Sequence, residues 1–221
     1  MNCLLFDFGG TLDSDGQTWL ERFYLIYKEA GVNVPRERFD RAFYDSDDSL
    51  PSRVSLKGRS LEETVLLQVE HALQALAPQR LDLASAITRR FVADCRIHFQ
   101  RNRPVLQRLA RRFSLGVVSN FYGNLNDILR LEGLAELFGA VADSGALGTL
   151  KPAPAIFLHA LEKLGSSAEH AVMIGDSIPR DMRGAESLKM RHVFLSQAAD
   201  PCCAQAIRLR AFTELEAMLP S

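Results

Sequence analysis

The sequence predicts an α/β fold in which a doubly wound parallel sheet carries an inserted all-helical block. Two observations lead to this prediction. From about residue 104 onward, short apolar runs alternate with segments of helical length, as in successive βαβ units. Residues 17 to about 100 contain no convincing strand and show the spacing of helices. The 221 residues, 47% of them apolar, suffice for a large core without disulfides.

The first expected strand is the apolar run Cys3–Phe6, which meets Asp7 and then a turn at Gly9 and Gly10. It should join the same sheet as four later apolar runs, at Ser114–Ser119, Ala140–Asp143, Ala171–Ile174 and His192–Leu195. The helices expected between these strands cover residues 104–112, 123–132, 153–164 and 180–188.

Two helices are expected in the inserted block. One covers Trp19 to Ala30, where apolar residues recur every three or four positions, and Gly31 ends it. The other begins after Ser60, a helix-capping residue followed by two acids, and ends before Pro78.

These elements predict two domains. Residues 1–15 and 101–221 should form the core with the sheet, and residues 16–100 should form a helical cap. The connections at residues 13–17 and near residues 95–103 should then act as hinges, and Gly16 suits the first of them because glycine tolerates unusual backbone angles.

Composition narrows the function classes. The formal charge is −1, with 26 Lys and Arg against 27 Asp and Glu, whereas proteins that coat nucleic acids are usually strongly basic. No apolar run approaches the length of a membrane span, and the start lacks the features of a signal peptide. The cysteines lack metal-ligand spacing and are expected to be free thiols in a reducing cytoplasm: Cys3, Cys95, Cys202 and Cys203.

Residues 89–112 hold eight arginines and one acid, Asp94. This stretch could bind an anion or a nucleic acid. We favour the alternative that solvated helix faces use arginine and that acids elsewhere balance it, so we expect no nucleic-acid partner and no membrane partner.

Polar residues cluster where four predicted strands end, and ligands of open parallel sheets bind at those ends. A carboxylate can attack phosphorus, and Mg²⁺ prefers oxygen ligands, so Asp7 and Asp176 suit a phosphate and metal site. Ser119 and Lys151 add a hydroxyl donor and a positive charge, and the amides of a glycine-rich turn can hold phosphate oxygens. The segments are Phe6–Leu12, Val117–Asn120, Gly148–Pro152 and Ile174–Asp181.

This set resembles the haloacid dehalogenase superfamily, and within it the phosphoglycolate-phosphatase-like branch with a helical cap. The most specific part is Gly148-x-x-Lys151-Pro152-x-Pro154-x-Ile156-Phe157, followed by Gly175-Asp176-Ser177-x-x-x-Asp181-x-x-Gly184-Ala185. The resemblance implies a Rossmann-like core, Mg²⁺ as cofactor and a small phosphorylated metabolite as substrate.

The resemblance also implies roles for individual residues. Asp7 would be the nucleophile and Lys151 would neutralise it together with the phosphate. The phosphate would be bound by Ser119, Asn120, Gly10 and Lys151, and the metal by Asp7, the Gly9 carbonyl, Asp176 and Asp181. We expect a monomer or a homodimer.

The sequence departs from the family pattern at Gly9, where phosphatases of this superfamily carry the aspartate that protonates the leaving oxygen. Such a group contributes typically about 10²- to 10⁴-fold to the rate. Asp13 or Asp15 could stand in for it, and otherwise activity should be weak or restricted to good leaving groups. Gly9→Asp should then raise the turnover of alkyl esters.

Three alternatives follow from this departure. Haloacid dehalogenases also lack that aspartate, but they carry an aromatic residue there and a different last motif. Phosphonatases carry a small residue there and use a cap lysine, for which Lys28 and Lys57 are available. The chain could also be a phosphate-binding relative without catalytic activity.

Overall fold

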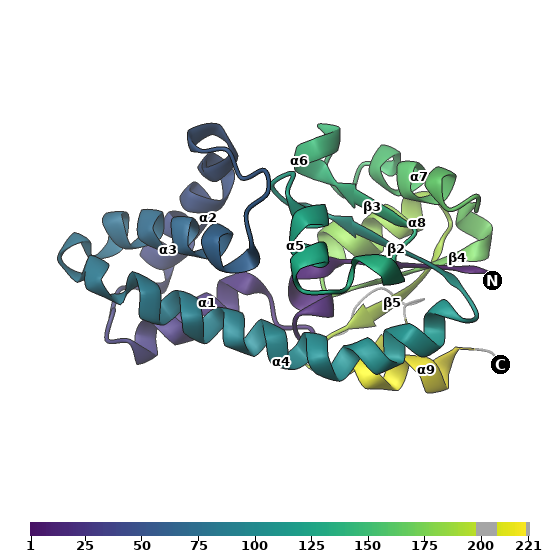
Figure 1. Ribbon diagram of the computed structural model, residues 1–221, viewed down its shortest axis with the longest axis horizontal. Coiled ribbons are helices and arrows are strands. Elements are labelled where there is room, and N and C mark those ends of the chain that lie inside the picture. Colours follow the sequence, from purple (N-terminus) through teal and green to yellow (C-terminus); the bar gives the residue numbers. More distant parts are fainter. Residues whose placement is uncertain (198–206, 220–221) are drawn as a thin grey trace.

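The computed structural model describes residues 1–197 and 207–219 of the chain. Within these residues six parallel strands form one sheet in the order β3-β2-β1-β4-β5-β6 (Figure 1). The predicted α/β fold with a parallel sheet is therefore confirmed, and it is Rossmann-like. The strands are β1 Cys3–Phe6, β2 Ser114–Ser119, β3 Ala140–Asp143, β4 Ala171–Gly175, β5 Arg191–Leu195 and β6 Ile207–Leu209.

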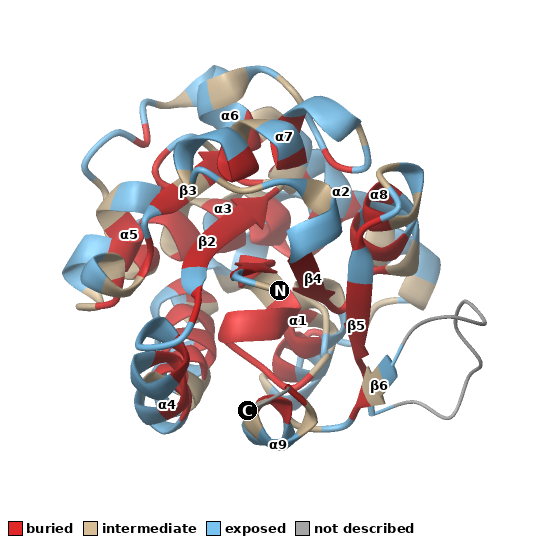
Figure 2. Ribbon diagram, turned by 90° about the vertical axis from the view of Figure 1, so that its right-hand side faces the viewer, coloured by how far each residue is buried: buried red, intermediate tan, exposed pale blue. Residues whose placement is uncertain are grey.

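The central strand β1 is fully buried, as Figure 2 shows for the middle of the sheet. It pairs with β2 and β4, and Phe6 lies opposite Val117 on one side and Ile174 on the other. This register aligns the carboxyl ends of the three strands. The side chains that follow them, including Asp7 and Asp176, are therefore brought to the same edge of the sheet.

Alternate residues of the strands serve two separate cores, as expected for a sheet covered on both faces. Leu5 and Met173 pack with α7 (Pro154–Lys163) and α8 (Arg183–Ser187). Leu4 and Phe6 pack on the other face, in a larger cluster that also includes residues of the helical block. Shorter helices complete the core: α5 Leu125–Leu131, α6 Ser144–Leu147 and α9 Leu215–Met218.

The helical block contains α1 Trp19–Glu29, α2 Arg36–Arg53, α3 Leu61–Leu76 and the start of α4 Ala84–Ala110. Figure 1 shows α1, α2 and α3 gathered beyond one end of the sheet. Ser60 caps α3 through a reciprocal bond with Glu63, so the predicted start of that helix is confirmed.

The second predicted hinge is wrong, because residues 95–103 lie inside the 27-residue helix α4. One face of this helix is buried through Cys95, Phe99 and Asn102, and the Asn102 amide donates to the Leu12 carbonyl over 3.0 Å. Pro104 lies within α4 and marks no helix start. The buried face that includes Cys95, Phe99 and Asn102 stabilises the helix on both sides of the proline.

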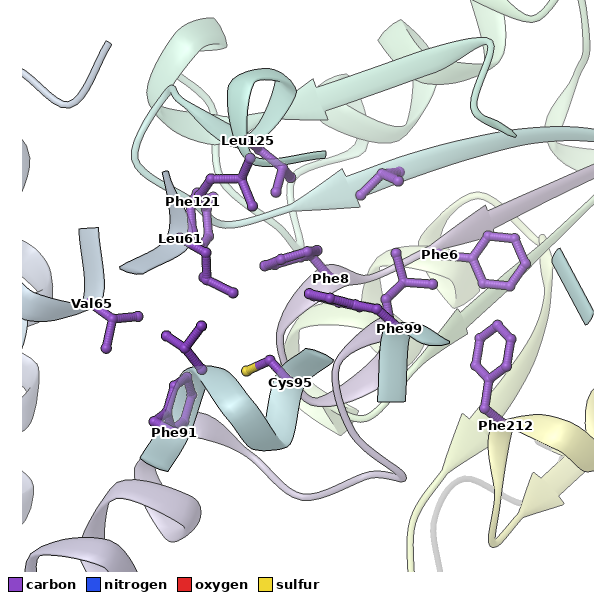
Figure 3. Close-up of a cluster of buried hydrophobic side chains, with 14 of the residues drawn as sticks. Phe6, Phe8, Leu61, Val65, Phe91, Cys95, Phe99, Phe121, Leu125 and Phe212 are labelled. Atoms are coloured by element: carbon purple, nitrogen blue, oxygen red, sulfur yellow. The ribbon is translucent and has the colours of Figure 1, made fainter. Parts of the chain in front are cut away.

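One continuous apolar cluster joins the helical block to the sheet (Figure 3). Phe8, which follows β1, packs against Phe99 of α4 and Phe121, with ring centroids 5.8 and 5.5 Å apart. Leu61 of α3 and Phe91 of α4 belong to the same cluster. The helical block is therefore packed directly over the first turn after β1.

The described cysteines, Cys3 and Cys95, are free and buried, whereas Cys202 and Cys203 lie outside the described residues. Across the described ranges, no helix combines the length and the apolar character needed to cross a membrane.

Candidate active site

A cavity of about 350 Å³ lies between the carboxyl ends of the strands and the helical block. Its sheet side is lined by Asp7, Gly9, Ser119, Asn120, Lys151 and Arg180. Its helical side is lined by α1 and α2, including Trp19, Glu21, Phe43, Tyr44 and Asp47. The four segments at the strand ends therefore meet at one cavity. The first three contribute residues that were predicted for the site, and the fourth, Ile174–Asp181, contributes Arg180.

Asp7 directly follows β1 and is 5% exposed. Its Oδ1 atom accepts hydrogen bonds from the Phe8 amide at 2.7 Å and from the Ser119 hydroxyl at 2.9 Å, and it lies 2.7 Å from Lys151 Nζ. Within residues 1–197 and 207–219 no donor reaches its Oδ2 atom. The carboxylate is thus fixed through one oxygen, while the other is left for a ligand.

Lys151 connects Asp7 to the last of the four segments. Its ammonium group is 1% exposed and lies 2.6 Å from Asp181 Oδ1 as well as beside Asp7. Burial opposes this charge, but Asp181 and Asp7 outweigh it and raise the pKa of Lys151. The side chain is therefore held as a cation at the place where a phosphate would meet Asp7.

Asp176 follows β4 and has an unsatisfied oxygen. Its Oδ1 accepts a hydrogen bond from the Thr11 hydroxyl at 3.2 Å, whereas no partner in the described part of the chain reaches its buried Oδ2. Burial, Asp7 and Asp181 raise the pKa of Asp176 well above its ordinary value. A buried carboxylate oxygen without a partner is unfavourable in its charged form, and a bound cation would stabilise it.

The three acids of the predicted metal site do lie together. Asp7, Asp176 and Asp181 are buried, and one oxygen from each lies within 4.8 Å of the others. Burial is the main cause that raises the pKa of Asp181 to about 6. Several carboxylate oxygens with one orphaned atom fit a hard divalent cation such as Mg²⁺.

The glycine turn after Asp7 fits closely around this cluster. A Cβ atom on Gly10 would lie 2.2 Å from Asp176 Oδ2, and the φ angle there is +91°, so only glycine suits this position. The Gly10 amide donates to Asp13 Oδ1 over 2.6 Å. It therefore does not point toward a phosphate, contrary to its predicted role, while the metal-binding role of the Gly9 carbonyl stays a prediction.

Asn120 lines the cavity, but its side chain holds the backbone of Lys151. Its amide donates to the Lys151 carbonyl at 3.1 Å, and its oxygen accepts from the Lys151 N–H at 2.7 Å. The side chain predicted to bind phosphate thus positions the lysine that would do so.

The space of the missing general acid is filled by an aromatic ring. A Cβ atom on Gly9 would lie 3.0 Å from Trp19 Nε1. That indole nitrogen donates to Asp13 Oδ2 over 2.7 Å, and Arg22 forms a 2.8 Å ion pair with the same oxygen. Asp15 in turn is held by Arg101 through bonds of 2.6 and 2.7 Å. Both acids are paired with arginines, so neither stands in for the missing aspartate.

Sequence reasoning missed Arg180, Tyr122 and Asp47 as cavity residues. Arg180 stands next to Asp181 in the last motif, and the nearby acids, outweighing its burial, raise the pKa of its guanidinium. Its position beside Asp181 could therefore have identified Arg180 from the sequence. Asp47 lies in α2, far from any motif, and no pattern in the sequence marks it.

The alternatives that depend on other basic residues lose support. Lys28 and Lys57 are exposed and do not line the cavity, so the phosphonatase-like alternative lacks its amine there. Four of the eight arginines in residues 89–112 form ion pairs with acids, as the balanced-surface interpretation expects: Arg90, Arg96, Arg101 and Arg108.

Comparison with known proteins decides the family. The family model described as "haloacid dehalogenase-like hydrolase" matches residues 1–189. The chain belongs to this hydrolase family. The predicted superfamily membership is thereby confirmed, and the four motifs of the cavity lie within the matched range.

Curated relatives match this chain over part of their length. Haloacid dehalogenase-like hydrolase domain-containing protein 3 from Bos taurus is 43% identical over 91 residues, which cover 41% of this chain and 36% of the bovine protein. Phosphoserine phosphatase from Thermus thermophilus is 39% identical over 69 residues, 31% of this chain and 28% of that enzyme. The chain thus matches about a third of the length of these relatives.

Solved structures share the fold over the whole chain. A HAD phosphatase from Thermococcus onnurineus has a TM-score of 0.58 at 22% identity and is covered to 97%, with 99% of this chain. A 2-haloacid dehalogenase from Pseudomonas syringae has a TM-score of 0.55 at 24% identity, with 98% and 97% coverage of this chain and of the dehalogenase. The fold is therefore common to enzymes named for different reactions, and the choice between them rests on the cavity.

Proposed function

We propose that this hydrolase is Mg²⁺-dependent and transfers the phosphoryl group of a small phosphorylated metabolite first to Asp7 and then to water. One observation carries the proposal: Asp7 is bonded through Oδ1 to Ser119 and Lys151 and belongs to a buried group of three carboxylates. A dehalogenation site would need no such cation-binding group. The phosphatase names among the relatives point the same way.

The chain's own residues account for binding and attack. Ser119 and Lys151 hold the transferring phosphoryl group against Asp7, and Arg180 adds a second positive charge at the cavity wall. An oxygen of Asp7 attacks phosphorus to give an aspartyl phosphate, which water then hydrolyses. Asp7, Asp176, Asp181 and the Gly9 carbonyl would hold the metal. When bound, Mg²⁺ supplies positive charge that offsets these carboxylates and the phosphate oxygens.

The absence of a side chain at Gly9 narrows the reaction. A leaving oxygen that is poorly stabilised needs a proton, and position 9 offers none while Trp19 fills the adjacent space. Aryl and acyl phosphates leave as stabilised anions and need less help. We therefore propose that activity is weak or restricted, and that such substrates are preferred over alkyl esters unless another donor serves.

The proposal is tested by turnover of 4-nitrophenyl phosphate with and without Mg²⁺. We expect Mg²⁺-dependent release of nitrophenolate that Asp7→Asn abolishes. Asp82→Asn, which changes a well-exposed acid of the helical block, is the control and should behave as the wild type. Binding of phosphate without turnover by the wild type would favour the non-catalytic alternative, and turnover retained by Asp7→Asn would contradict the proposal.

We also propose that the protein works in the cytoplasm as a monomer or a homodimer. The buried thiols of Cys3 and Cys95, which form no disulfide, support a reducing compartment. The paired arginines of α4 support a small-molecule partner over a nucleic acid.

A further inference from the structure

A carboxyl group of the helical block faces the cavity that holds Asp7. Among the described residues that line this cavity, three carry carboxyl groups: Asp7, Glu21 and Asp47. The Glu21 side chain is 50% exposed and forms an ion pair with Arg36. Asp47 of α2 is partly buried and forms no ion pair within the described ranges. It is therefore the acid best placed to exchange a proton with a bound substrate.

Asp47 is held in place through one oxygen only. The Tyr122 hydroxyl donates a hydrogen bond to Asp47 Oδ1, and the Gln68 amide reaches the same atom at 3.4 Å. No donor in residues 1–197 and 207–219 reaches Oδ2. Tyr122 stands three residues after Ser119, which contacts Asp7. The loop that carries the phosphate-binding serine thus also orients the carboxyl group of the helical block.

The surroundings of Asp47 favour its protonated form. Burial raises the pKa of Asp47 above its ordinary range, and Asp48 on the same helix adds to this, while Tyr122 and Arg180 oppose it. Arg180 also interacts with Asp7, so both acids lie within the electrostatic reach of one guanidinium across the cavity. Gln68 of α3 is uncharged. A carboxyl group that is easily protonated is what a proton donor to a leaving oxygen requires.

We propose that Asp47 is the general acid and base of this hydrolase and supplies from the helical block the proton that an aspartate at position 9 would supply. This inference rests on the proposed function. It follows from the elimination of the other candidates: position 9 has no side chain, and Asp13 and Asp15 are tied to arginines.

A proton moves to or from Asp47 in each of the two chemical steps. As an oxygen of Asp7 bonds to phosphorus, the bond from phosphorus to the leaving oxygen breaks, and the proton of the Asp47 carboxyl passes to that oxygen, so that a neutral alcohol departs. In the second step the Asp47 carboxylate takes a proton from water while that water attacks phosphorus. The bond from phosphorus to Asp7 breaks, which restores the Asp7 carboxylate, the protonated Asp47 and free inorganic phosphate.

The test compares Asp47→Asn with Asp48→Asn in the presence of Mg²⁺. Asn keeps an oxygen for Tyr122 but cannot give up a proton, and Asp48, an exposed neighbour outside the cavity, is the matched control. With ethyl phosphate, whose leaving group needs a proton, Asp47→Asn should lower turnover by about 10²- to 10⁴-fold. With 4-nitrophenyl phosphate the same variant should release nitrophenolate in a burst that matches the enzyme concentration and then turn over slowly, because only the second step needs the base.

A pH profile separates a catalytic from a structural role. Tyr122→Phe removes a donor that lowers the pKa of Asp47, so the limb of the ethyl phosphate profile that reports Asp47 should move to higher pH. If Asp47→Asn matches the wild type on both substrates, or loses the burst and the turnover alike, the inference is wrong. If the wild type hydrolyses neither substrate, the proposed function itself fails.

Discussion

The Trp19 indole occupies space that a side chain at position 9 would need, so substitutions at the two positions should be energetically coupled. A Cβ atom on Gly9 would lie 3.0 Å from Nε1, closer than the 3.4–4 Å of ordinary van der Waals contact. The indole cannot easily yield. It is fixed by its 2.7 Å bond to Asp13 and by edge contacts with Phe91 and Phe121, at centroid distances of 5.0 and 5.8 Å.

The size of the effect follows from two opposing terms. Overpacking of this kind costs about 1–3 kcal/mol of unfolding free energy. The backbone of Gly9 has φ −77° and ψ 120°, which other residues adopt freely. Replacing glycine there should therefore raise the free energy of unfolding by about 0.4–1 kcal/mol, because the unfolded chain becomes less flexible. Gly9→Ala should then lower the free energy of unfolding by about 1.3 kcal/mol, the difference between the midpoints of these ranges.

The assay is urea unfolding of the wild type, Gly9→Ala, Trp19→Leu and the double variant. Leucine removes the indole, so in that background Gly9→Ala should stabilise by about 0.4–1 kcal/mol, and the coupling energy should be about 1–3 kcal/mol. A coupling below about 0.5 kcal/mol, the range in which independent sites add, would refute the reasoning. For the same reason the rise in alkyl ester turnover that the sequence predicts for Gly9→Asp should appear only when Trp19→Leu is combined with it. The comparison is made in the Asp47→Asn variant, in which Asp47 no longer supplies the proton.

Three further outcomes are expected. Asp176→Asn should weaken Mg²⁺ binding in calorimetry by more than about 10-fold, since loss of an outer-shell partner alone costs about 10- to 100-fold, while Asp82→Asn should bind like the wild type. Burial opposes the charge of Asp15, but the hydrogen bonds and charge of Arg101 outweigh it and lower the pKa of Asp15. The charged side chain therefore stabilises the fold above the pKa of the unfolded chain, about 3.9, and this stabilisation is lost as the pH falls through the lower pKa of the folded state. Asp15→Asn should cost about 1–3 kcal/mol in denaturant unfolding at pH 7, and equal stability of the two proteins at pH 7 would contradict this. Lys57→Ala should leave turnover of 4-nitrophenyl phosphate unchanged, because an effect would revive the cap-lysine mechanism.

The sheet could be predicted from the sequence because each buried parallel strand is a continuous apolar run. Cys3–Phe6 and Ser114–Ser119 are strands with the predicted bounds. The strand Ile207–Leu209 was missed because three residues carry too little pattern. Helix α2 was missed although Phe39 and Phe43 have helical spacing, since charged residues separate them.

The sheet side of the site could be predicted because its residues stand at strand ends, which the parallel topology brings together. Asp7, Lys151 and Asp176 are the clearest cases. The helical side could not be predicted, because the contact of Asp47 with Tyr122 joins residues 75 positions apart and depends on how the helical block packs.

Phosphoryl transfer to Asp7 is the central claim, and trapping the covalent intermediate tests it most directly. The protein is mixed with 4-nitrophenyl phosphate and Mg²⁺, quenched in acid within one turnover and digested for mass spectrometry. We predict one phosphoryl group on the peptide that contains Asp7, absent from Asp7→Asn and enriched in Asp47→Asn, whose second step is slowed. Nitrophenolate release by the wild type with no phosphoryl group on that peptide, in either the wild type or Asp47→Asn, would contradict the account.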